Sequence, residues 1–167
     1  MQPHSSDEIQ PDARDLTIAI VTSRYHSDIT DVLRDGAVEA FVEAGGSRDS
    51  LLLLDAPGTF ELPVICSHCC VDRGPRTPDA IVALGCVIQG ETTHDRYIND
   101  AVSQHLMRLS VDTGMPIGFG VLTCATHAQA AARAGGDHGH KGIETMHAVL
   151  KAVAAIRTLD QPAPQHS

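Results

Sequence analysis

Residues 80–88 read Ala-Ile-Val-Ala-Leu-Gly-Cys-Val-Ile, an apolar run of nine residues that Gln-Gly-Glu-Thr-Thr-His follows at 89–94. A short apolar run without polar alternation is typical of a β-strand that is buried on both faces. Residues 93–113 then carry apolar side chains at helical spacing, which predicts a helix directly after the strand. Parallel α/β sheets are built from such units of buried strand and helix, so this segment decides the fold class.

The same alternation continues on both sides of this segment. Three further strands are predicted at residues 16–22, 50–54 and 116–122. Helices are predicted at residues 29–44, 60–72, 125–134 and from about 141 onward. This order predicts an α/β protein, a flavodoxin-like three-layer α/β/α sandwich with a four-stranded parallel sheet. We expect one domain over residues 15–159, between a flexible N-terminal tail (1–14) and a C-terminal tail (160–167).

Composition and charge exclude several classes of protein. The chain of 167 residues has 12 Lys and Arg against 21 Asp and Glu, a net charge of −9. A broad nucleic-acid surface needs the opposite sign, and no apolar run is long enough to cross a bilayer. The polar N-terminus contains no apolar secretory segment, and the five cysteines do not repeat in a disulfide framework. We therefore expect no nucleic-acid or membrane partner, free thiols and a cytoplasmic location.

Candidate functional residues follow the predicted strands, because ligands of parallel α/β sheets bind beyond the carboxyl ends of the strands. These ends are Ser-Arg-Tyr-His (23–26), Ala-Pro-Gly-Thr-Phe-Glu (56–61), 89–94 and Thr-Cys-Ala-Thr-His (123–127). The chain has only two Tyr, three Phe and no Trp, yet Tyr25 and Phe60 fall in these segments and Phe119 lies in the last strand. These rings either stack on a planar heteroaromatic substrate or serve as ordinary core and loop residues.

The turn at 90–94 is a candidate anion site. Its backbone N–H groups lie at the start of the helix that follows, and a glycine lets an anion approach them closely. The alternative is that Thr92 or Thr93 simply caps the helix. Arg133 ends a short Ala-rich helix, where it either complements the helix dipole or binds a phosphate. His94 is either a surface residue or a group that transfers protons near neutral pH.

Two clusters have the composition of metal sites. They are Cys-Ser-His-Cys-Cys at 66–70, and His138 and His140 with His147. Neither cluster has the paired ligand spacing of a zinc finger or ribbon. Cysteines on one helix face are more simply explained as small buried hydrophobes. We therefore expect no functional metal.

Several longer motifs occur in a fixed order. They are Ser-Arg-Tyr (23–25), Pro-Gly-Thr-Phe-Glu-Leu-Pro (57–63), Ala-Leu-Gly-Cys-Val-Ile-Gln-Gly-Glu-Thr-Thr-His (83–94), Pro-Ile-Gly-Phe-Gly-Val-Leu-Thr (116–123), Ala-Arg-Ala-Gly (132–135) and His-Lys-Gly (140–142). In order and spacing, from about residue 16 to 155, they resemble the 6,7-dimethyl-8-ribityllumazine synthase family. The chain departs from that family's common residues at Tyr25, His26, Gln89 and Ala132.

This resemblance implies a transferase of riboflavin biosynthesis that uses no cofactor. The implied reaction joins 5-amino-6-(D-ribitylamino)uracil to 3,4-dihydroxy-2-butanone 4-phosphate and yields the lumazine, phosphate and water. Joining an amine to a ketone requires proton transfer rather than redox chemistry, which suits a histidine beside an anion pocket.

The resemblance also implies a role for each candidate residue. His94 corresponds to the residue that transfers protons in catalysis. The pyrimidine and ribityl chain would contact Tyr25, Thr59, Phe60, Glu61, Cys86, Val87, Ile88 and Phe119. The phosphate would contact Glu91, Thr92 and Arg133. Phe119 corresponds to a residue that a neighbouring subunit contributes.

The family's assembly is implied as well. A head-to-tail interface closes into a ring, and the family's ring is a pentamer. Members that remain pentamers often carry extra residues between the last two helices, whereas here only residues 136–140 separate Gly135 from Lys141. We therefore expect a pentamer at least, and a sixty-subunit icosahedral shell rather than a free pentamer or decamer. Riboflavin synthase is a candidate partner.

Two other functions stay open at this stage. One is an inactive relative that binds flavins or serves as a shell protein, against which His94 and Arg133 argue. The other is a flavodoxin-like carrier of flavin mononucleotide. The segment 23–26 contains no glycine for a phosphate loop after the first strand, which disfavours the carrier.

Overall fold

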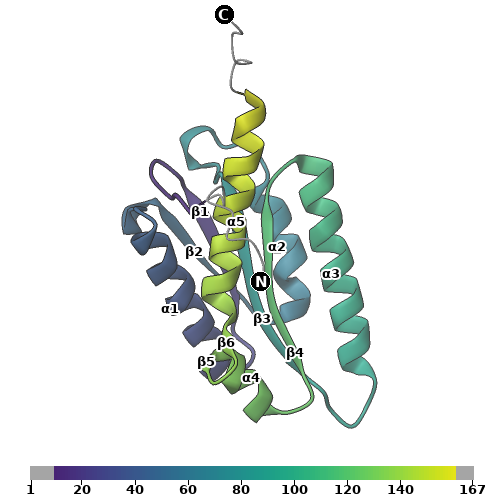
Figure 1. The fold of residues 1–167 in the computed structure, drawn as a ribbon. Helices are drawn as coiled ribbons and strands as arrows, with labels where there is room; N and C mark the ends of the chain where they lie inside the picture. Colours follow the sequence, from purple (N-terminus) through teal and green to yellow (C-terminus); the bar gives the residue numbers. More distant parts are fainter. Residues whose placement is uncertain (1–9, 161–167) are drawn as a thin grey trace, which may run out of the picture.

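The computed structural model describes residues 10–160. Its centre is a sheet of four parallel strands in the order β2-β1-β3-β4 (Figure 1). The strands are β1 (Ile18–Ser23), β2 (Leu51–Ala56), β3 (Ala80–Ile88) and β4 (Ile117–Cys124). Five α-helices accompany them: α1 (Ser27–Glu43), α2 (Leu62–Cys69), α3 (His94–Thr113), α4 (His127–Arg133) and α5 (Lys141–Arg157). The predicted three-layer α/β/α sandwich with a four-stranded parallel sheet is confirmed.

Alternate residues of β1 and β3 face two separate hydrophobic cores, whereas Leu53 and Leu54 of the edge strand β2 are exposed. Ile18 and Ile20 of β1 pack with α1 and α5, whereas Ala19 and Val21 pack with α2 and α3 on the other face (Figure 1). In β3, which pairs on both edges, eight of the nine residues are buried. Burial on both faces explains why this strand carries no polar side chain.

The strands end at different heights, and this step creates the site. The pairing of β1 with β3 ends at Thr22 and Leu84. β3 continues to Ile88 and pairs over this stretch with β4, up to Cys124. Residues 85–88 therefore extend beyond β1 and leave one edge of β3 open above the turn that follows β1.

The second predicted helix is shorter than expected. In place of a helix over 60–72, a 3₁₀ turn (Thr59–Glu61) precedes α2, which ends at Cys69. Pro63 lies in the first turn of α2, where its missing N–H loses no helical hydrogen bond. The proline therefore delays the helix and leaves residues 59–61 in the turn.

The segment before α5 contains a feature that was not predicted. The helix expected at 125–134 is α4, and the chain then forms a small antiparallel hairpin from β5 (Ala134–Gly136) and β6 (Gly139–His140). Gly135 and Gly139 have φ of 100° and 86°, conformations that glycine adopts without strain. These glycines permit the tight reversal that ends α4.

The packed part of the chain begins earlier than the expected boundary at residue 15. Ala13 is fully buried, and its N–H donates to the carbonyl oxygen of Ala44 at 2.9 Å. The rest of the expected N-terminal tail falls mainly on residues 1–9, outside the described residues, as do 161–167. Within residues 10–160, none of the helices combines the length and apolarity needed to span a membrane.

α1 and α5 approach so closely that their contact requires glycine. A Cβ on Gly142 would overlap the carbonyl oxygen of Leu33, and one on Gly36 would overlap the His140 ring. The start of α5 therefore rests on the backbone of α1. This contact fixes the position of the hairpin that immediately precedes α5.

We expect Gly142→Ala to destabilise the fold by about 1–3 kcal/mol, the typical cost of overpacking. The sign of the change in unfolding free energy is informative, because alanine has a higher helix propensity than glycine. A loss of stability must therefore come from the overlap with α1. Urea unfolding followed by circular dichroism measures the change in the free energy of unfolding. Gly90→Ala is the matched control, since a Cβ there meets no heavy atom within 4 Å. Equal losses in the two variants would contradict the close contact of α1 with α5.

Candidate functional site

A cavity of about 440 Å³ opens where β3 extends beyond β1. Nine of the twelve predicted site residues line it: Tyr25, Thr59, Phe60, Glu61, Cys86, Val87, Ile88, Thr92 and His94. They come from three segments that are far apart in the sequence, around residue 25, at 59–61 and at 86–94. The cavity also contacts residues that were not predicted for the site: His26, Gly58, Asp95 and Ile98. Asp95 and Ile98 follow His94 on α3, and helical spacing from His94 could have identified Ile98.

Two of the three candidate rings form the cavity wall rather than the core. Tyr25 and Phe60 are 67% and 60% exposed although aromatic side chains are rarely left open to solvent. Exposed rings beside a cavity provide flat apolar surfaces for a planar ligand. These two rings are therefore not core residues; they lie on turns beside the cavity, and their stacking on a substrate stays a prediction.

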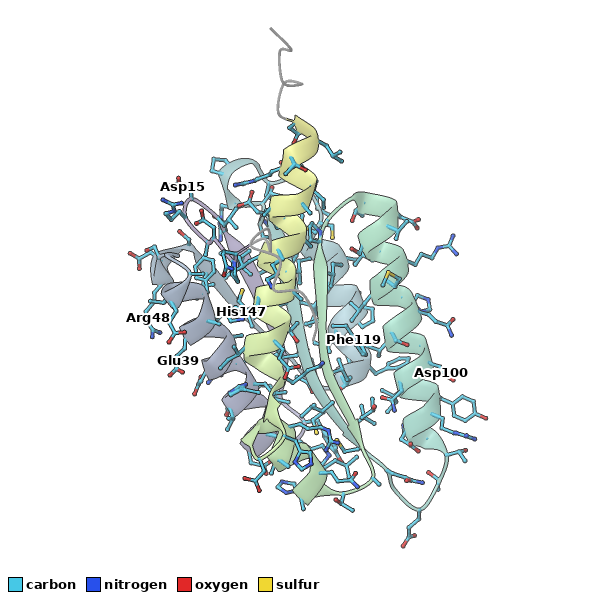
Figure 2. All side chains as sticks on the ribbon, in the orientation of Figure 1. Asp15, Glu39, Arg48, Asp100, Phe119 and His147 are labelled. Atoms are coloured by element: carbon cyan, nitrogen blue, oxygen red, sulfur yellow. The ribbon has the colours of Figure 1, made fainter. Side chains whose placement is uncertain are left out.

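Phe119 lies elsewhere. It is part of β4, beside α3 (Figure 2), and contacts an apolar groove that Met107, Val111 and Ile156 also line. Phe119 is 40% exposed. The structure of a single chain therefore does not bring Phe119 to the cavity that contains His94.

The end of β3 supplies the floor of the cavity. Cys86 and Val87 are buried, and burial raises the pKa of Cys86 to about 12, so its side chain is a neutral thiol at physiological pH. Thr59 packs against this strand at Gly85, where a Cβ would lie 2.8 Å from the Thr59 hydroxyl. The Thr59 hydroxyl is buried and has no hydrogen-bond partner among the described residues. A buried hydroxyl without a partner costs free energy.

The turn 90–94 remains open to an anion. α3 begins at His94, and Thr93, its N-cap residue, makes no side-chain cap hydrogen bond. The simple capping role considered for Thr93 is therefore absent. A Cβ at Gly90 would meet no atom within 4 Å, which leaves the backbone accessible. Glu91 is exposed and does not line the cavity, so of the three predicted phosphate-binding residues only Thr92 does.

Arg133 lines a different cavity, of about 280 Å³. This second cavity lies between the end of β4 and the start of α5 and is lined by Arg133 with Thr123, Cys124, His138, Lys141 and Glu144. The Arg133 guanidinium donates to the carbonyl oxygen of Gln129 at 3.1 Å, within its own helix. Lys141 lies 3.4 Å from Glu144. In one chain, the candidate phosphate-binding arginine and His94 are therefore in separate cavities.

The cysteine and histidine clusters do not form a ligand set within residues 10–160. No group of three His, Cys, Asp or Glu side chains in that part of the chain could hold a metal ion. Cys66 is buried, and burial raises the pKa of its thiol and of those of Cys69 and Cys70. These side chains behave as small apolar groups of α2.

One polar contact joins the two helices that border the cavities. The Nε2 atom of His127 on α4 lies 2.5 Å from a carboxylate oxygen of Asp28 on α1. A carboxylate only accepts, so Nε2 carries the proton. This hydrogen bond holds the pKa of Asp28 below its ordinary value of 3.8.

We expect His127→Gln to move the midpoint of acid unfolding to higher pH. The pKa of Asp28 is lower in the folded state, so the pair stabilises the fold above the unfolded pKa and loses this effect as pH falls through the lowered value. Circular dichroism during acid titration measures the midpoint. Arg108→Gln removes an ion pair that is also exposed but lies within α3 and joins no second element, so it should leave the midpoint in place. A midpoint that is the same for His127→Gln as for the unsubstituted chain would contradict the stabilising role.

Comparisons with known proteins identify the family to which the chain belongs. The family model for 6,7-dimethyl-8-ribityllumazine synthase matches residues 15–157. The synthase of Streptomyces avermitilis is 45% identical over 150 residues, covering 89% of both chains. That of Porphyromonas gingivalis is 40% identical over 150 residues, 90% of this chain and 91% of the relative. That of Kineococcus radiotolerans is 42% identical over 167 residues, 99% of each. Matches of this extent confirm the resemblance of the motifs: the chain belongs to the 6,7-dimethyl-8-ribityllumazine synthase family of enzymes.

Proposed function

We propose that this enzyme condenses 5-amino-6-(D-ribitylamino)uracil with 3,4-dihydroxy-2-butanone 4-phosphate, as a transferase in riboflavin biosynthesis. The products are 6,7-dimethyl-8-ribityllumazine, phosphate and water. The observation that carries the proposal is the convergence of nine residues from three separate family motifs on one cavity. A chain that had merely kept the fold as a shell protein would have no need of that convergence.

The cavity offers each reacting group a suitable neighbour. Tyr25 and Phe60 present rings to the pyrimidine, while Thr59 and Glu61 offer polar atoms to the ribityl chain. The backbone at the end of β3 provides N–H and carbonyl groups for the edge of the uracil. New carbon–nitrogen bonds form as phosphate and water leave, so protons must move between nitrogen and oxygen atoms. Holding both substrates in one cavity supplies much of the acceleration through proximity.

His94 is the proposed proton carrier. It lines the cavity at the start of α3, beside the open turn 90–94, and its ring makes no hydrogen bond to another residue in the described part of the chain. The imidazole is therefore free to exchange protons with the substrates. The phosphate would lie against the backbone of Glu91 and Thr92.

We expect His94→Ala to lower kcat by about 10²-fold, the low end for general acid–base catalysis, because amines condense readily with ketones. The affinity for the pyrimidine should change little. Lumazine absorbance follows the reaction, and isothermal titration calorimetry measures pyrimidine binding. A purified chain that forms no lumazine from the two substrates would contradict the proposed function. An unchanged kcat in His94→Ala would remove only His94 from the mechanism.

The phosphate requires a cation that the first cavity does not provide. Among residues 10–160, its lining contains the carboxylates of Glu61 and Asp95 but no Lys or Arg, whereas Arg133 and Lys141 line the second cavity. A phosphate dianion beside His94 would thus meet carboxylates without a compensating cation. We propose that a second copy of the chain brings its Arg133, and its Phe119, to the first cavity.

This shared site fits a closed ring of copies. The proposed ring is a pentamer, and sixty subunits form the proposed icosahedral shell, because the short hairpin 134–140 contains no insertion between α4 and α5. We propose a cytoplasmic location on the ground that all five cysteines are free thiols. Riboflavin synthase, which would use the lumazine, is the proposed partner.

We expect the variants His94→Ala and Arg133→Ala, each weakly active alone, to restore activity when they are co-expressed. If one site takes His94 from one copy and Arg133 from another, random mixing regenerates about a quarter of the sites. In Arg133→Ala, the KM should rise more for the butanone phosphate than for the pyrimidine, since a charge-assisted hydrogen bond to the phosphate is lost.

The control is a mixture of the two variants purified separately and combined without co-assembly. Analytical ultracentrifugation of each preparation reports the size of the particle. No recovery in co-assembled particles, or full activity in a species of 17.7 kDa, would contradict the shared site.

A further inference from the structure

The turn between β1 and α1 presents Tyr25 to the cavity, and its backbone is unusual at His26. His26 has φ 58° and ψ 49°, in the left-handed region, where a Cβ crowds the carbonyl oxygen. Within residues 10–160, Asp15 is the one other non-glycine residue with a positive φ. Such a conformation persists only where surrounding contacts hold it.

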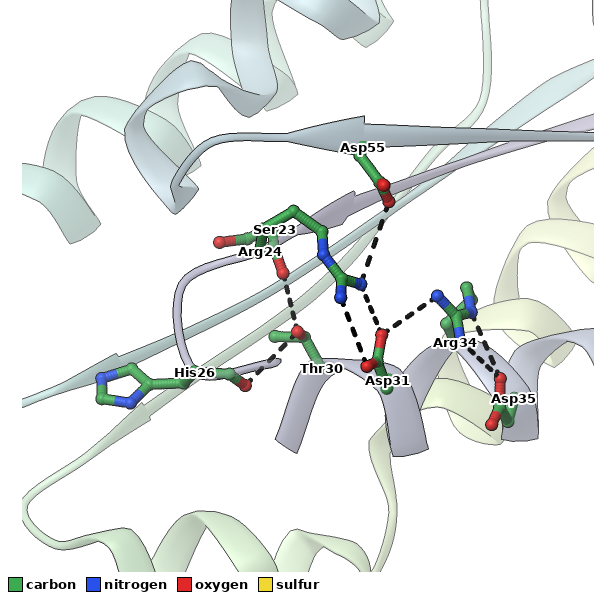
Figure 3. A network of polar contacts seen from close by, with 8 residues as sticks. All are labelled: Ser23, Arg24, His26, Thr30, Asp31, Arg34, Asp35 and Asp55. Atoms are coloured by element: carbon green, nitrogen blue, oxygen red, sulfur yellow. Dashed lines mark hydrogen bonds and ion pairs between the residues drawn. The ribbon is translucent and has the colours of Figure 1, made fainter. Parts of the chain in front are cut away.

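The first of these contacts comes from inside the fold. Thr30 of α1 is fully buried, and its hydroxyl donates to the carbonyl oxygen of Ser23 at 2.7 Å. The same hydroxyl lies 3.3 Å from the carbonyl oxygen of His26 (Figure 3). Thr30 therefore closes the turn by contacting the residues at both of its ends.

A second set of contacts fastens the turn from outside. Arg24 donates to the two carboxylate oxygens of Asp31 at 2.5 and 3.4 Å, and it lies 3.9 Å from Asp55 of β2 (Figure 3). Arg34 holds the same Asp31 at 3.0 Å. The backbone N–H of Arg24 also donates to Ala56 at 2.8 Å. The residue before Tyr25 is thus tied to α1 and to β2.

The His26 side chain does not serve the helix that it precedes. His26 is the N-cap residue of α1, yet it makes no side-chain cap hydrogen bond. Ser, Thr, Asp and Asn are the residues that most often cap a helix, and of these Asn and Asp also tolerate a positive φ. In Figure 3 the His26 ring extends away from Thr30 and Asp31. The ring instead stands edge to face against Tyr25, with centroids 4.7 Å apart and planes at 77°.

We infer that His26 is a positioning residue for Tyr25, which its ring holds in the orientation that stacks on the pyrimidine. This inference rests on the proposed function. Both side chains line the cavity, and Tyr25 is 67% exposed, so the His26 contact restricts a ring that solvent would otherwise leave mobile. An ordered ring binds more tightly, because the substrate does not have to immobilise it.

The test uses two variants that remove the ring and keep the turn. Asn and Gly both tolerate a positive φ, and asparagine can also cap α1. We expect His26→Asn and His26→Gly to raise the Kd and KM for the pyrimidine about 3- to 10-fold, the value of an edge-to-face pair. The KM for the butanone phosphate and kcat should change by less than about twofold. Unfolding in urea should show His26→Asn to be at least as stable as the unsubstituted chain.

Tyr25→Ala supplies the matched background. If His26 acts through Tyr25, adding His26→Asn to Tyr25→Ala causes no further loss of pyrimidine affinity. If the unsubstituted chain is active, either of two results would overturn the inference. One is unchanged pyrimidine affinity in both His26 variants. The other is a loss of pyrimidine affinity on His26→Asn that is as large in the Tyr25→Ala background as in the unsubstituted chain. Absence of condensation by the unsubstituted chain would instead overturn the proposed function, and with it the role of His26.

Discussion

The pairing of β3 with a strand on each edge is the constraint on which the rest of the structure depends. Both faces of β3 are covered by helices and both edges are hydrogen-bonded over most of its length, so its residues are apolar and buried. The strand nevertheless extends beyond the end of β1. Its last residues, 85–88, thereby bring a regular backbone edge to a place where no further strand competes for it. A rigid core element thus ends directly in the cavity.

Small residues then determine how closely the other elements approach this strand. Gly85 leaves room for Thr59, which brings the turn with Phe60 and Glu61 against the end of β3. Gly142 likewise lets α5 rest on α1. Since a side chain at either position would push an element outward, these glycines connect packing in the core with the geometry of the cavities. The position of the hairpin before α5, and of Arg133 beside it, follows from the second contact.

The fold and much of the site could be predicted from the sequence because they depend on local patterns. The continuous apolar run 80–88 marks a strand that is buried on both faces, and the segments at the strand ends contain Thr59 and His94, which line the cavity. The place of Cys86 beside the cavity was implied only by the family resemblance. Other features depend on the tertiary structure. Nothing in the spacing reveals that Arg133 lines a separate cavity, or that the His26 backbone is left-handed. The sequence pattern does not predict the hairpin 134–140, because the hairpin is short and its glycines equally suit the end of a helix.

The division of charge between the two cavities explains why a chain with a net charge of −9 can use an anionic substrate. The first cavity contains carboxylates and neutral groups, which suit hydroxyl and amide hydrogens, and the second contains Arg133 and Lys141. Within one chain, a cation permanently beside His94 would also attract Glu61 and Asp95, and an ion pair would then occupy the phosphate site. In the proposed ring the cation comes from another copy, on a helix whose place is fixed by its own fold. In that proposed assembly the two halves of the site meet, and the phosphate would be bound where neither half alone could hold it.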